Sequence, residues 1–176
     1  MAVLKKMGRL IRAIAVAIAA WQLSACASGP FETDDGLSSL SVQEVREQMS
    51  ASDSLDDQIA ESVLWGGVIL NTQNLVDGTQ IEVMGYPLDR RQRPMLGRDP
   101  EGRFLVKSTD FLEPVDYAQG RSISLLGQIS GVSQGTVGEA QYPYPTIEAT
   151  EVHLWKENEL PSKPRVTFGI GVNIGL

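Results

Sequence analysis

The sequence of 176 residues has few of the side chains on which most catalytic and metal sites depend, with one cysteine, Cys26, and one histidine, His153. A single cysteine cannot form a disulfide within the chain. Histidine is the usual acid–base group near neutral pH and the commonest metal ligand, and His153 stands alone between Val152 and Leu154. We interpret His153 as a structural or surface residue and expect no catalytic or metal site.

Long apolar runs are also absent. The strongly apolar stretch at 13–23 is about half as long as the roughly 20 residues that a membrane-spanning helix needs, so we expect no such helix. Four basic residues precede it, and no acidic residue occurs before Glu32; the four are Lys5, Lys6, Arg9 and Arg12. This charge layout predicts a secretory signal peptide over residues 1–25.

Basic residues are too few for nucleic-acid binding. The chain has 15 Lys and Arg against 22 Asp and Glu, with a net charge of −7. Removal of residues 1–25 would take away the four basic residues named above and leave a net charge of about −11. Phosphate neutralisation requires a surplus of basic side chains, so we expect no nucleic-acid partner.

The lone cysteine closes the apolar stretch in the order Leu23-Ser24-Ala25-Cys26, which is the pattern of a bacterial lipobox. We predict that Cys26 carries N-acyl and S-diacylglycerol groups, with no other cofactor, which leaves no free thiol for nucleophilic catalysis or zinc. Two or three acyl chains attach a protein stably to a membrane. Ala27 in place of Asp favours the outer membrane. The alternative is an ordinary signal peptide cut after Ala25.

Residues 26–40 have the small, polar, Gly- and Pro-containing composition of a flexible tether. A capping box at Ser41 and apolar residues at helical spacing then predict a helix over about 42–50, and a second helical turn is possible at 55–59. These elements lead into a domain predicted to span residues 41–160.

The remainder of that domain has the two-residue period of β-strands. Strands are expected at 63–70, 79–84, 103–107, 122–132 and 146–155, with a hairpin turn at Asp77-Gly78. Glycines within the first and fourth strands indicate bulges or sharp bends; they are Gly66, Gly67, Gly127 and Gly131. The pattern predicts a mainly β fold, a small OB-like barrel of five to six strands with a short N-terminal helix. A two-sheet sandwich is the alternative.

The C-terminal segment, residues 161–176, alternates apolar residues with small or polar ones from Val166 to Leu176. An amphipathic, Gly-rich strand of this kind can pair within the barrel, add to the sheet of a partner, or touch lipid. An intramolecular strand is our first expectation. A membrane-spanning barrel would need more strands than this chain offers.

Several motifs in order resemble the Slp (starvation-inducible) outer-membrane lipoproteins over about residues 60–156. They are Trp65-Gly66-Gly67, Ile81-Glu82-Val83, Tyr86-Pro87-Leu88, Arg93-Pro94, Gly102-Arg103-Phe104, Phe111-Leu112-Glu113-Pro114 with Tyr117, Gly120-Arg121, Gly127, Gly131, Tyr142 and Leu154-Trp155. The resemblance implies a lipid-anchored envelope protein associated with starvation or stationary phase, without enzymatic activity. After Trp155, where some relatives have a longer aromatic and proline-rich tail, this sequence departs from them and has the Gly-interleaved strand, so the role of that tail is not carried over.

A cluster of arginines and a pair of tyrosines are the candidate ligand-binding residues. Arg90, Arg91, Arg93 and Arg98 can bind phosphate or carboxylate groups bidentately, or pair with nearby carboxylates. The motif Tyr142-Pro143-Tyr144-Pro145 places two tyrosines on one side of an extended segment, where they can stack on a sugar or pack against the barrel rim.

Two carboxylate pairs have the side chains of a glycosidase pair, but we interpret them as solvated surface; they are Asp110 with Glu113 and Glu139 with Glu148. The sequence therefore predicts a non-catalytic lipoprotein anchored to the outer membrane, at its periplasmic face, with a structural or interaction role in the envelope. Its partners would be the membrane itself and an envelope protein or glycan. The alternative is an OB-like module that binds anionic glycan or lipopolysaccharide through the Arg90–Arg98 loop.

Overall fold

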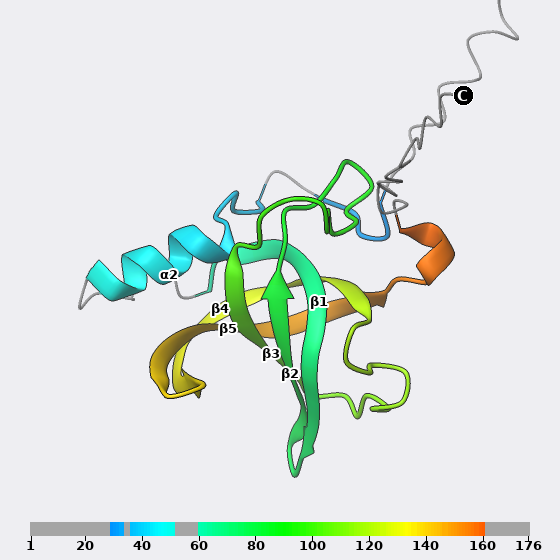
Figure 1. Cartoon of the computed structure of the whole chain (residues 1–176). Coiled ribbons are helices and arrows are strands. Elements are labelled where there is room, and N and C mark those ends of the chain that lie inside the picture. The colour runs from blue at the N-terminus through cyan, green and yellow to red at the C-terminus, as the bar shows by residue number, and fades with distance from the viewer. Residues whose placement is uncertain (1–28, 34–35, 52–59, 161–176) are drawn as a thin grey trace, which may run out of the picture.

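The computed structural model describes residues 29–33, 36–51 and 60–160, without the side chains of 49–51 (Figure 1). The predicted signal peptide, Cys26, the second helical turn at 55–59 and the C-terminal strand at 161–176 lie outside these ranges. Within them, no helix has the length and apolar composition needed to cross a bilayer.

One helix and five strands account for most of the described chain. The helix α2 (Val42–Ala51) confirms the predicted helix, and the 3-10 turn η1 (Glu157–Glu159) follows the last strand. The strands are β1 (Ser62–Leu75), β2 (Gly78–Gly85), β3 (Gly102–Ser108), β4 (Ser122–Val137) and β5 (Ala140–Leu154). All five predicted strands are present, but β4 and β5 extend toward each other as a long hairpin that the Pro-containing sequence at 142–145 had hidden.

The strands form one sheet that closes on itself in the order β1-β2-β3-β5-β4, with β4 paired back to β1. Every pairing is antiparallel except that of β3 with β5, so the sheet is mixed. Because the described strands form one closed sheet, the alternative of a two-sheet sandwich is wrong for them. Register shifts at Leu126/Gly127 and Ile129/Gly131 bend β4, which confirms the predicted role of these glycines.

A tight approach of two strands explains one of the glycines in β1. Gly67 pairs with Gly85 of β2, and a Cβ atom added at Gly67 would collide with the carbonyl oxygen of Met84. A side chain at this position would push β2 away from β1. The Gly66-Gly67 sequence is therefore required by the close packing of the ring.

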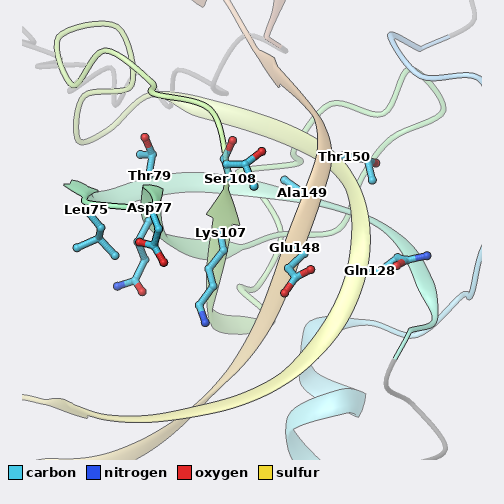
Figure 2. A pocket seen from close by; sticks show the side chains of 12 residues that line it. Leu75, Asp77, Thr79, Lys107, Ser108, Gln128, Glu148, Ala149 and Thr150 are labelled. Atoms are coloured by element: carbon cyan, nitrogen blue, oxygen red, sulfur yellow. The ribbon is translucent and has the colours of Figure 1, made fainter.

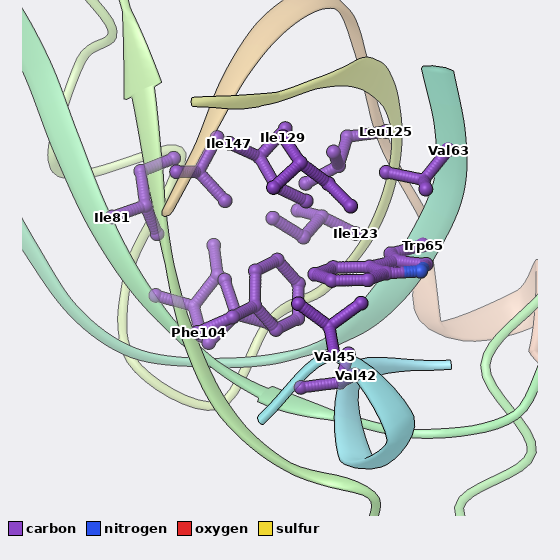
Figure 3. Packing of buried hydrophobic residues seen from close by; sticks show 13 residues of the cluster. Val42, Val45, Val63, Trp65, Ile81, Phe104, Ile123, Leu125, Ile129 and Ile147 are labelled. Carbon is purple, nitrogen blue, oxygen red and sulfur yellow. The ribbon is translucent and has the colours of Figure 1, made fainter. Parts of the chain in front are cut away.

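The alternating apolar residues of the strands point into the ring and form a single core, which Figure 3 shows from close by. The rings of Trp65 and Phe104 meet edge to face, with centroids 5.3 Å apart. Val42 and Val45 of α2 pack against the same cluster and belong to its fully buried members. The spacing of these two valines on one helical face is what allows α2 to cover the core.

Parts of the predicted tether pack on the barrel, so the expectation of a flexible segment over 26–40 is wrong for these residues. Phe31 is 5% exposed, and its backbone exchanges two hydrogen bonds with the side chain of Gln92. Ser38 pairs with Val63 at the edge of β1, and Leu40 accepts a hydrogen bond of 2.7 Å from the indole N–H of Trp65. A buried aromatic ring and satisfied backbone groups offset the entropy that a polar segment loses on docking.

Candidate functional site

The arginine cluster lies in the loop that connects β2 to β3, residues 86–101. A bridge between Leu88 and Pro94 closes a turn in this loop, and Arg90 and Arg91 occupy its tip. The carboxylate of Asp89 holds the turn by accepting hydrogen bonds from the backbone N–H groups of Arg91 and Arg93, at 2.8 and 3.0 Å. The turn thus presents two neighbouring arginines on a hydrogen-bonded frame.

Arg93 has a structural role in that frame. Its guanidinium pairs with the Asp89 carboxylate at 2.7 Å and also donates to the carbonyl of Glu159, which ties the loop to η1. Burial by itself would raise the pKa of Asp89, but the hydrogen bonds from Arg93 and Arg91 outweigh it and lower that pKa. The Arg93 guanidinium is therefore already paired within the protein.

The other three predicted arginines are exposed. Arg90, Arg91 and Arg98 reach solvent, and within the described residues their guanidinium groups make no hydrogen bond or ion pair. These three side chains are available for an anionic ligand, because a guanidinium group offers several donors in a planar fork.

The two predicted tyrosines pack the long hairpin onto the barrel and offer no free platform. Tyr144 is 5% exposed and donates to the carboxylate of Glu82, which also forms an ion pair with Arg103 at 2.8 Å. The hydroxyl of Tyr142 accepts hydrogen bonds from Arg46 and from the backbone N–H of Arg103, and Arg46 lies over its ring. Burial and the nearby Glu82 carboxylate raise the pKa of Tyr144. In the structure Tyr144 is thus buried against Glu82, and half-buried Tyr142 contacts Arg46 and Arg103.

His153 is half-buried within an aromatic group on the outside of β5. Its ring lies edge to face against Trp155, with centroids 4.4 Å apart, and against Phe31 at 6.5 Å. The indole N–H of Trp155 donates to the hydroxyl of Ser124 at 2.9 Å. The His153 ring therefore packs between two aromatic side chains, which agrees with its interpretation as a structural or surface residue.

The carboxylate pairs are not assembled into a site. Asp110 and Glu113 are both exposed in the loop between β3 and β4. Glu139 lies in the turn between β4 and β5, whereas Glu148 lies well along β5 opposite Gln128. In the described part of the chain, no group of three or more His, Cys, Asp or Glu side chains is placed to hold a metal ion.

A groove of about 520 Å³ lies where β3 and β5 part, beside the β1–β2 hairpin, and Figure 2 shows its lining. Lys107 of β3 and Glu148 of β5 are partners in the parallel register, and Asp77 of the hairpin turn also lines the groove. Gln80 and Gln128 add amide groups. Sequence reasoning missed this groove, because the pairing of Lys107 with Glu148 depends on the closure of the ring and not on local pattern.

Comparisons with known proteins find relatives among outer membrane lipoproteins. The pattern of the Outer membrane lipoprotein Slp family matches residues 23–170. An uncharacterized lipoprotein of Escherichia coli K12, YeaY, is 29% identical over 158 residues, which cover 88% of this chain and 79% of YeaY. An uncharacterized Haemophilus influenzae protein is 33% identical over 96 residues, covering 54% and 52% of the two chains.

The outer membrane protein Slp of Escherichia coli K12 is 26% identical over 102 residues, covering 58% of this chain and 54% of Slp. The matches to Slp and to the Haemophilus protein thus span about half of each relative. Among solved structures, a DUF3299 family protein of Pseudomonas aeruginosa has a TM-score of 0.38 and 12% identity, covering 74% of this chain and 92% of that protein. By the match over residues 23–170, the chain belongs to the Slp family of outer membrane lipoproteins.

Proposed function

We propose that this chain is a non-catalytic lipoprotein in which Cys26 carries N-acyl and S-diacylglycerol groups and holds the barrel at the periplasmic face of the outer membrane. The observation that carries the proposal is the lipobox Leu23-Ser24-Ala25-Cys26 after a basic and then apolar leader, at the start of the family match. Residues 1–25 are then the cleaved signal peptide.

The barrel in this proposal is an OB-like module with a structural or interaction role in the envelope under starvation or in stationary phase. The strand order β1-β2-β3-β5-β4 with a parallel β3–β5 pair supports the OB-like description. The lone, half-buried histidine, the separation of Glu139 from Glu148 and the exposure of Asp110 and Glu113 support a non-catalytic role. The starvation association comes from the family resemblance.

Metabolic labelling with palmitate tests the anchor. The wild-type chain is expected to incorporate label and to be processed, whereas Cys26→Ser should incorporate none and accumulate as the full-length precursor, because the sulfur that accepts diacylglycerol is absent. Ser28→Ala, outside the lipobox, is the control and should label like the wild type. Labelling of the Cys26→Ser chain at the wild-type level would refute the anchor.

A second candidate function is capture of an anionic glycan or lipopolysaccharide by the β2–β3 loop. The exposure of Arg90, Arg91 and Arg98 favours it. This second proposal leaves out three of the candidate residues, because Arg93 is paired within the turn and Tyr142 and Tyr144 pack against the barrel. Replacement of the three exposed arginines by Ser should abolish salt-sensitive binding to lipopolysaccharide fragments, and a wild-type chain that binds none would refute it.

A further inference from the structure

The docked position of Phe31 sets a limit on the distance between the barrel and the proposed lipid anchor. The ring of Phe31 is buried, and its backbone N–H and carbonyl are held by Gln92 at 2.9 and 3.0 Å. Only five peptide units separate Cys26 from Phe31. A fully extended chain spans at most about 3.5 Å per residue, so the two Cα atoms lie within about 17 Å of each other.

The residue that holds Phe31 belongs to the arginine turn. Gln92 directly follows Arg90 and Arg91, and both of these arginines are exposed at the tip of the turn. The region that must remain close to an acylated Cys26 is therefore the one that presents free guanidinium groups. The far end of the barrel, at the β1–β2 hairpin, points away from this region in Figure 1.

The local charge also differs from that of the whole chain. The β2–β3 loop has four arginines against three carboxylates, in a chain whose net charge is −7. One of those carboxylates, Asp89, is already paired with Arg93. Arg90, Arg91 and Arg98 then remain against two carboxylates, Asp99 and Glu101, so the loop keeps an excess of one positive charge, while Arg90 and Arg91 at the tip have no carboxylate between them.

We propose that Arg90 and Arg91, with Arg98, bind the phosphate groups of lipid headgroups in the same leaflet that holds the acyl chains of Cys26. This inference rests on the proposed lipid anchor. Arginine binds phosphate through paired N–H donors, and a short connection to the membrane gives headgroups a high effective concentration at the turn. The contact fixes the orientation of the barrel, with the β2–β3 loop against the bilayer and the β1–β2 hairpin facing the periplasm.

The same reasoning favours headgroups over a soluble glycan as the anion. Headgroup phosphates surround any acylated Cys26 at all times, whereas a glycan has to reach the narrow space between the loop and the bilayer. The limit of about 17 Å between the Cα atoms of Cys26 and Phe31 keeps the turn that holds Phe31 near those headgroups. Competition by a soluble glycan is therefore an outcome that the experiment must distinguish.

The experiment uses the lipidated, processed protein, which begins at Cys26, in vesicles of phosphatidylethanolamine and phosphatidylglycerol that contain a headgroup-attached nitroxide lipid. Acylated Cys26 leaves no other thiol, so one introduced cysteine gives a unique site for a fluorophore. Gly97→Cys labels the β2–β3 loop, where an added Cβ meets nothing within 4 Å. Val76→Cys labels the exposed hairpin tip at the far end and is the matched control.

The label at 97 should be quenched several-fold more than the label at 76. Adding Arg90→Ser and Arg91→Ser should remove most of this difference, as should high salt, while Arg90→Lys with Arg91→Lys should retain part of it. Thermal unfolding of each variant checks that the fold is intact, which is expected because both arginines are exposed.

The outcomes distinguish failure of the lipid anchor from failure of the headgroup contact. Failure of the protein to float with vesicles contradicts the lipid anchor itself, whatever the labels report. Flotation with equal quenching at 97 and 76, or quenching at 97 that the double Ser variant leaves unchanged, overturns the headgroup contact alone. Loss of quenching on addition of a soluble phosphorylated glycan overturns it in favour of glycan capture.

Discussion

Phe31 and Gln92, 61 residues apart in the sequence, are joined by two reciprocal hydrogen bonds between a backbone and a side-chain amide. The Gln92 amide thereby replaces the strand that Phe31 would otherwise need to satisfy its N–H and carbonyl groups. Gln92 adopts a left-handed backbone with φ of 63°, which directs its side chain to Phe31 from within the arginine turn. The N-terminal segment and the β2–β3 loop are therefore one structural unit.

Shortening the Gln92 side chain should release that segment. Gln92→Asn tolerates the left-handed backbone but lacks the methylene that reaches Phe31, so both hydrogen bonds are lost at a cost of about 1–3 kcal/mol. Hydrogen exchange of the Phe31 amide should accelerate accordingly. Gln134→Asn, an exposed position of β4, is the control and should leave this amide protected. Equal protection in the Gln92 variant would contradict the docking.

Two buried serines in β4 should respond oppositely to removal of their hydroxyl groups. Ser124 accepts from the Trp155 indole at 2.9 Å and donates to the Gln92 carbonyl, so Ser124→Ala leaves two buried groups unpaired and should lower the free energy of unfolding by about 1–3 kcal/mol. The Ser122 hydroxyl is buried without a partner among the described residues, so Ser122→Ala should be neutral or stabilising. Urea unfolding compares the two, and similar losses would refute the assignment.

The Glu101 carboxyl should make stability depend on pH. Burial, together with the nearby Glu44, raises its pKa above the ordinary value of 4.5, although a hydrogen bond from the Val42 backbone opposes this. A carboxyl whose pKa is raised on folding stabilises the protein at low pH, and this contribution is lost as pH rises through the folded pKa.

Glu101→Gln mimics the protonated form at every pH. Its free energy of unfolding should match that of the wild type near pH 4 and exceed it increasingly as pH rises above the ordinary value of 4.5. Thermal melts at a series of pH values measure the difference. Glu139→Gln, an exposed residue of the β4–β5 turn, should show no comparable trend. A constant difference between Glu101→Gln and wild type would contradict the prediction.

Closure of the ring should be sensitive to one methyl group in β1. Gly67→Ala places a Cβ against the Met84 carbonyl and should cost at least about 1–3 kcal/mol, because the β1–β2 backbones have to separate. Gly97→Ala, where the added Cβ meets open space, should change the melting temperature little. Equal melting temperatures for the two variants would show that the strands are not packed this closely.

The elements of the fold were predictable because they depend on neighbouring residues. The capping box at Ser41, where Glu44 accepts the Ser41 backbone N–H at 2.8 Å, marked the start of α2 in sequence and in structure. The alternation of Ile81 and Val83 similarly located β2, and both residues are fully buried. The strand ends were less predictable: β1 and β4 each run five residues beyond their expected ends at 70 and 132, and prolines at 143 and 145 concealed the start of β5.

The β-rich pattern, the lipobox, the acidic charge and the family motifs can all be read along the chain, because each depends on residues close together in the sequence. Which candidate side chains remain unpaired depends instead on contacts between distant residues. Arg93 is held by Asp89 and Glu159, and Tyr144 is buried against Glu82, so that Arg90, Arg91 and Arg98 alone among the candidate arginines and tyrosines are exposed without a described partner. These contacts join residues that ring closure brings together, and no local period records which distant group a side chain will meet.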